Sequence, residues 1–100
     1  MSGIDFEWDT RKDFTNRRKH GVAFVEALTV FGDPLSITIP DPNYVVGEER
    51  FVIIGLSSEQ RLLVVVHTVT RERIRLISAR LATKHERRNY EEGSDETQVH

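Results

Sequence analysis

The run Leu62-Leu63-Val64-Val65-Val66 decides the fold of this 100-residue chain. It is apolar at every position, which is typical of a β-strand that is covered on both faces and lies inside a sheet. We expect this strand over residues 61–70. Shorter strands are expected over 35–39, 50–56 and 74–79, and the polar turns between them predict an antiparallel meander.

The chain before the meander predicts one strand and two helices. Residues 4–8 alternate between apolar and acidic side chains, the period of a half-buried strand. Asp9 can cap a helix over 10–20, in which Phe14 is the one large apolar anchor, and Gly21 can end it. A short helix is expected over 23–31.

The chain after the meander predicts a last helix. Thr83 and Glu86 have the spacing of a capping box, so this helix is expected over 84–92. The sequence thus predicts a single α+β domain over 1–92, ordered β-α-α-β-β-β-β-α, with helices packed against one antiparallel sheet. Residues 93–100 are expected to form an acidic, disordered tail.

The composition is that of a globular cytoplasmic protein, with 38% hydrophobic and 30% charged residues. The sequence contains no stretch of about 18 apolar residues and no secretory signal pattern, so no membrane association is expected. It has no cysteine, which excludes disulfides, thiolate zinc sites and a cysteine nucleophile. The four histidines have no recognised metal-ligand spacing, so we expect neither metal nor cofactor.

The net charge of −2 conceals two basic segments. Four of the 16 acidic residues lie in the last ten residues, so the rest of the chain carries 14 basic and 12 acidic residues. Such segments can attract phosphate if they converge in space; alternatively, they are solvated faces with local salt bridges. Twelve basic residues form them: Arg11, Lys12, Arg17, Arg18, Lys19, Arg71, Arg73, Arg75, Arg80, Lys84, Arg87 and Arg88.

Two candidate sites have strong structural alternatives. His20 shares a helix face with Asn16 and Lys12, but cations at a helix C-terminus are favourable without any active site. Glu49 at a strand entrance could act as a general base beside Arg50, although edge strands also carry charges to resist aggregation.

Two further candidates lie on the last two strands. His67 and Arg71 have the same strand parity and can project into one site, unless His67 is a hydrogen-bonded core residue. Arg80 ends a strand just before a helix N-terminus, a favourable place for phosphate. Arg75 lies near it in the sequence, and Tyr90 could stack on a base or serve packing.

An ordered set of motifs extends over about residues 5–90: Phe6-Glu7-Trp8-Asp9, Asn16, Lys19-His20-Gly21-Val22, Phe24, Glu26-Ala27, Phe31, Asp33-Pro34, Glu48-Glu49-Arg50, Ile54-Gly55, Leu63-Val64-Val65, Arg75 to Arg80, Ala82-Thr83, Glu86-Arg87 and Tyr90. In this order, the motifs resemble the BrnT family of bacterial toxins. Leu81 and Ala23 depart from the family pattern, in which a basic residue and a small polar residue, respectively, are usual.

The resemblance implies a RelE-like ribonuclease fold and an RNA-cleaving toxin that inhibits translation. It also implies a BrnA-like ribbon-helix-helix antitoxin, and we expect the two proteins to form a 2:2 complex. The toxin would contact operator DNA only through this antitoxin. A non-catalytic nucleic-acid-binding module and a structural adaptor are the alternatives.

We expect metal-independent cleavage by attack of the ribose 2′-OH on the adjacent phosphate, which requires a proton acceptor, a proton donor and cations. Arg80 and Arg71 would bind the phosphate, and Glu49 or His67 would act as base with His20 as acid. Further RNA contacts are expected from Lys12, Lys19, Arg50, Arg75 and Tyr90.

Overall fold

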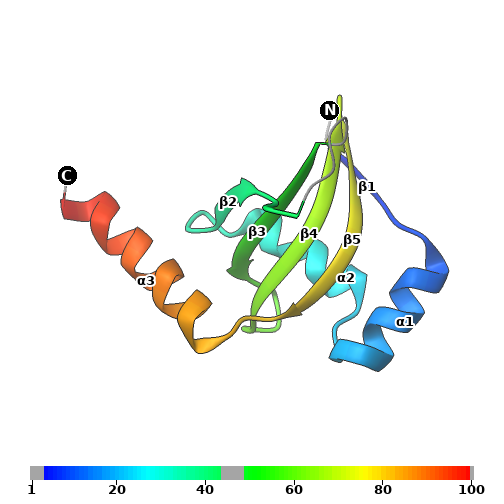
Figure 1. The fold of residues 1–100 in the computed structure, drawn as a ribbon, viewed down its shortest axis with the longest axis horizontal. Coiled ribbons are helices and arrows are strands. Elements are labelled where there is room, and N and C mark those ends of the chain that lie inside the picture. Colours follow the sequence, from blue (N-terminus) through cyan, green and yellow to red (C-terminus); the bar gives the residue numbers. More distant parts are fainter. Residues whose placement is uncertain (1–3, 44–48, 100) are drawn as a thin grey trace.

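The computed structural model describes residues 4–43 and 49–99, with side chains as far as residue 93. Five strands form one sheet in the order β1-β5-β4-β3-β2, and helices follow β1 and β5 along the chain (Figure 1). The elements are β1 (Asp5–Glu7), α1 (Thr10–His20), α2 (Phe24–Ala27), the 3-10 helix η1 (Leu28–Gly32), β2 (Ile37–Pro40), β3 (Arg50–Leu56), β4 (Leu62–Thr70), β5 (Arg73–Leu81) and α3 (Lys84–Val99).

Strand β4 lies at the centre of the sheet and is covered on both faces, which confirms the prediction from its apolar run. Leu63 and Val65 belong to a large core cluster with residues of α2 and η1. Leu62 and Val64 belong to a smaller cluster on the other face, packed against Tyr90 of α3. We call these the first and second faces of the sheet.

The sheet is mixed, so the prediction of a wholly antiparallel sheet is wrong. β1 pairs in parallel with β5, placing Asp5 opposite Arg73 and Glu7 opposite Arg75. The other three pairings are antiparallel. The meander leaves one edge of β5 open, and β1 comes from a distant part of the chain to pair with it. The local pattern of β1 specifies a strand but not its partner.

The helices lie on both faces of the sheet. α1 and α2 pack towards the first face, whereas α3 begins beyond β5, contacts the second face and then reaches away from the sheet (Figure 1). Within the described part of the chain, no helix is long and apolar enough to span a membrane.

The first helix has the predicted bounds and caps. The Asp9 carboxylate accepts hydrogen bonds from the backbone N–H groups of Arg11 (2.7 Å) and Lys12 (3.3 Å). Gly21 ends the helix with a left-handed φ of 71°, a conformation that glycine adopts without steric cost. Phe14 is not the anchor that the sequence predicted, because its side chain is 53% exposed.

Asn16 anchors α1 instead. Its Nδ2 donates to the carbonyl oxygens of Val22 (2.8 Å) and Ala79 (2.7 Å), and its Oδ1 accepts from the N–H of Ala79 (3.0 Å). These bonds satisfy buried backbone groups, which are costly to leave unpaired. They fix the helix against β5.

The other helices differ from prediction at their ends. The expected second helix over 23–31 is a short α-helix that continues as η1. The last helix starts as predicted but runs to Val99, beyond the predicted end at residue 92. Gly93 continues the helix close to Ile37, where an added Cβ would lie 2.9 Å from the isoleucine Cδ1.

Candidate active site at the bulge of β5

An extra residue in β5 determines which side chains reach the second face. His67 of β4 pairs with Leu76, whereas Val66 pairs with Ser78, so Ile77 is the inserted residue of a β-bulge. Leu76 and Ala79 consequently both lie in the first-face core, although three positions separate them. Arg75 and Arg80, which a regular strand would place on opposite faces, therefore both lie on the second face.

A cleft of about 590 Å³ opens on the second face between α3 and the sheet. Its floor is apolar, formed by Val52 and Ile54 of β3 and by Val64 and Val66 of β4. Its polar lining includes Asp41, Arg50, Ser78, Arg80, His85, Glu86 and Asn89. A concave site with an apolar floor and convergent polar groups is the usual form of a ligand site.

Arg80 is held at one side of this cleft by the first turn of α3. Its Nη1 and Nη2 each donate to a carboxylate oxygen of Glu86, at 2.8 Å. Its Nη1 also donates to the carbonyl of Leu81 at 3.1 Å. The Arg80 hydrogen bonds lower the pKa of Glu86 to about 2, against the effect of burial, and the same pair raises the pKa of Arg80. Both groups are therefore charged at neutral pH.

A second hollow, of about 300 Å³, lies between α1 and β5. It is lined by Arg11, Lys12 and Lys19 of the first basic segment and by His20, so the structure brings these residues together. Ile77 and Ser78 at the bulge line both this hollow and the cleft. The two hollows therefore adjoin at β5. The hollow beside α1 is basic, whereas in the cleft Arg50 and Arg80 are accompanied by Asp41 and Glu86.

His67 lies outside both hollows, in the first-face core. It is 2% exposed, and its ring centroid lies 4.9 Å from that of Phe31 and 6.0 Å from that of Phe51. Its Nδ1 lies 3.3 Å from the carbonyl oxygen of Val65. Burial lowers the pKa of His67, because the charged imidazole would lose its hydration. The structure thus places His67 as a neutral core residue.

Replacing His67 by leucine is expected to leave the RNA cleavage that the resemblance implies nearly unchanged. The lowered pKa means that His67 adds stability above pH 6.5 that is lost as the pH falls towards its folded-state pKa. The wild type should therefore lose more stability between pH 7 and pH 5 than the variant does. Urea unfolding at both pH values tests this; a folded variant that cannot cleave RNA would restore His67 to the site.

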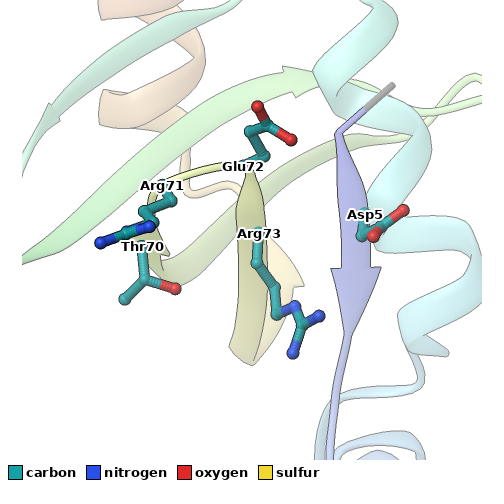
Figure 2. A pocket seen from close by; sticks show the side chains of 5 residues that line it. All are labelled: Asp5, Thr70, Arg71, Glu72 and Arg73. Carbon is teal, nitrogen blue, oxygen red and sulfur yellow. The ribbon is translucent and has the colours of Figure 1, made fainter. Parts of the chain in front are cut away.

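Arg71 does not share a site with His67, so the pairing expected from strand parity is wrong. β4 ends at Thr70, and Arg71 lies in the hairpin turn with a positive φ of 50°. It lines a hollow of about 470 Å³ with Asp5, Glu72 and Arg73. Figure 2 shows the side chains of Arg71 and Arg73 pointing away from each other.

The remaining charged candidates are only partly in the cleft. Glu49 is exposed just before β3 and does not line the described hollows, and Glu48 lies outside the described residues. Arg50 lines the cleft and its Nε lies 4.0 Å from a carboxylate oxygen of Asp41. Arg75 is 3.3 Å from a carboxylate oxygen of Glu7.

Tyr90 secures α3 to the sheet. Its hydroxyl donates to Asp33 Oδ2 at 2.6 Å, and its ring packs on the second-face cluster. Burial and the neighbouring carboxylate raise the pKa of Tyr90 to about 12. This placement does not support the expected role of Tyr90 in stacking on a base. Its contacts are those of a residue that packs α3 against the sheet.

Sequence reasoning did not select Ser78, His85 and Asn89, which line the cleft. His85 and Asn89 are four residues apart and share a helix face. That spacing was visible in the sequence. However, whether these two side chains reach the cleft depends on where α3 lies, and the helix pattern does not specify that position.

Comparisons with known proteins agree with this architecture. Residues 8–86 match the family described as "Ribonuclease toxin, BrnT, of type II toxin-antitoxin system". The fold is similar to that in the crystal structure of the Brucella abortus ribonuclease toxin BrnT, with a TM-score of 0.64 and 21% sequence identity over 81% of this chain and 99% of that chain. No curated protein matches the chain in sequence. The chain belongs to the BrnT family of ribonuclease toxins of type II toxin–antitoxin systems.

Proposed function

We propose that the chain is a metal-independent endoribonuclease that cuts RNA by 2′-OH attack and thereby inhibits translation. The observation that carries this proposal is the placement of Arg80 in a cleft that also contains His85 and adjoins the basic hollow of α1. Such a surface supplies cations for phosphate and imidazoles for proton transfer, the groups that this reaction requires.

In the proposed reaction, the ribose 2′-oxygen attacks phosphorus and the bond from phosphorus to the 5′-oxygen breaks. The products are a 2′,3′-cyclic phosphate and a 5′-hydroxyl. Arg80 and Arg50 bind the phosphate oxygens, on which negative charge develops. We assign the two proton transfers to His85 and His20, because they line the joined hollows, whereas His67 is buried and Glu49 lies outside them.

Lys12 and Lys19 of α1 are proposed to guide the RNA backbone towards the bulge of β5. Both are exposed and line the hollow next to Ser78. Contacts of this kind give salt-dependent affinity without sequence preference. Arg75 would act in the same way, in competition with its ion pair to Glu7.

A type II toxin has a protein antitoxin as its partner, and we propose a BrnA-like ribbon-helix-helix protein in a 2:2 cytoplasmic complex. Operator DNA would be reached only through that antitoxin, and the toxin itself would have a RelE-like fold. The apolar floor of the cleft and the adjoining basic hollow suit an acidic amphipathic segment. The mass of the co-purified complex in solution tests the stoichiometry.

Cleavage of RNA by the purified, antitoxin-free protein in EDTA tests the proposed function. We expect cleavage to persist, with products ending in 2′,3′-cyclic phosphate. A matched substrate with a single 2′-deoxyribose at the cleaved position should remain intact, since it lacks the attacking oxygen. Cutting of the deoxy substrate would refute the mechanism. Failure to cut naked RNA and translating ribosomes alike would favour a non-catalytic binding module.

A further inference from the structure

We propose that Glu86 is a positioning residue that holds Arg80 so that one edge of its guanidinium group faces a phosphate of the RNA. This inference rests on the proposed function, because it assumes that Arg80 binds phosphate. It goes further by assigning each donor of Arg80 to a partner.

The hydrogen bonds of Arg80 divide its guanidinium group into two edges. A guanidinium group has five N–H donors, and three of them are used. Nη1 donates to Glu86 and to the Leu81 carbonyl, and Nη2 donates to Glu86. The remaining donors are the N–H of Nε and one N–H of Nη2, and no described residue accepts from them.

The two remaining donors lie side by side on the same edge of the guanidinium plane. A pair of parallel N–H donors matches two oxygens of one phosphate group. The Glu86 carboxylate occupies the end of the group, so it does not block this edge. Arg80 can therefore bind Glu86 and a phosphate at the same time.

Glu86 is itself fixed by the start of α3. Its Oε1 accepts from the N–H of Thr83 at 2.9 Å, and its own N–H donates to Thr83 Oγ1 at 3.1 Å. This capping box ties the carboxylate to the backbone. The side chain of Glu86 is 23% exposed, compared with 42% for Arg80, so the more buried partner is the one with backbone support.

The alternative is that Glu86 only neutralises Arg80 and weakens its attraction for RNA. The two roles predict opposite signs. Removing a negative charge near a phosphate site should tighten binding by simple electrostatics. Removing a positioning contact should weaken binding, because the guanidinium must then be ordered by the RNA itself.

Glu86→Gln separates these roles, since glutamine also forms a capping box and keeps the helix start. The matched control is Glu91→Gln, which removes the same charge from an exposed position of the same helix. The probe is a labelled 2′-O-methyl oligoribonucleotide of mixed sequence, which cannot be cut by 2′-OH attack. Its Kd is measured for wild type, both single variants, Arg80→Ala and the Arg80→Ala/Glu86→Gln double variant.

We expect Glu86→Gln to weaken binding about 5- to 10-fold, in keeping with the net contribution of about one hydrogen bond. Glu91→Gln should bind as tightly as wild type or slightly more tightly. In the Arg80→Ala background, Glu86→Gln should have no further effect, because it acts through Arg80. Equal or tighter binding by Glu86→Gln, or a loss that persists without Arg80, would overturn the proposal.

Cleavage of ordinary RNA by the same variants keeps this inference separate from the proposed function. A wild type that binds the probe with the expected dependence on Glu86 and Arg80, but never cuts RNA, would contradict only the proposed ribonuclease mechanism. A wild type that cuts RNA while Glu86→Gln binds and cuts equally well would contradict only the positioning role.

Discussion

Replacing Arg80 by alanine should reduce RNA cleavage by about 100-fold or more while leaving the protein folded. Loss of one preorganised donor to the charge that develops in a transition state costs on the order of 100- to 1000-fold in rate. Arg80 lines the cleft and has two N–H donors with no acceptor among the described residues. Its side chain is 42% exposed, so its removal creates no core cavity. The measurement is single-turnover cleavage in EDTA, with circular dichroism to confirm folding.

Arg88→Ala is the matched control for this prediction. Arg88 is an exposed arginine of α3 and does not line the described cleft. Its loss removes the same charge, so it should slow cleavage only by a small factor that disappears at higher salt. If both variants lose activity equally, and salt abolishes the difference from wild type, then Arg80 contributes only to the general basic field.

Replacing Asn16 by alanine should destabilise the fold by about 4 kcal/mol, because three buried backbone groups lose their partner. For a domain of about 100 residues, this corresponds to a fall in Tm of roughly 15–30 °C. The loss is not explained by helix propensity, since alanine favours a helix more than asparagine does. Thermal and urea unfolding at pH 7 measure the effect.

Thr15→Ala is the control, at an exposed neighbouring position of α1. It should change stability by about 0.5 kcal/mol or less, as is usual for surface substitutions. A small effect of Asn16→Ala would mean that water replaces the amide. In that case α1 would depend on its apolar contacts for its position on β5.

Much of the fold follows from local patterns. The bounds of α1 and β3 match the prediction, because the caps Asp9 and Gly21 and the apolar run from Phe51 to Ile54 are local signals. The direction of β1 and the side on which α3 lies depend on contacts between distant segments. Neither strand alternation nor a capping box carries that information.

The candidate site was less predictable than the fold, because strand alternation fails at a bulge and beyond the end of a strand. Strand alternation predicted that Arg71 lies on the same face as His67, but the strand ends at Thr70. Arg80 was selected for its position before a helix, which requires no parity. Lys12 and His20 were predicted from helical spacing and Lys19 from its basic segment, and the structure brings all three into one hollow.

The bulge at Ile77 also limits how sequences of this kind can diverge in length. Deleting one residue between Leu76 and Ala79 would rotate the end of β5 by half a turn, sending Arg80 towards the core and Ala79 towards the cleft. A substitution next to the bulge changes one side chain. An insertion or deletion at the bulge moves every following side chain of β5 to the opposite face of the sheet. We therefore expect insertions and deletions between Leu76 and Ala79 to be tolerated less often than substitutions of the residues around them.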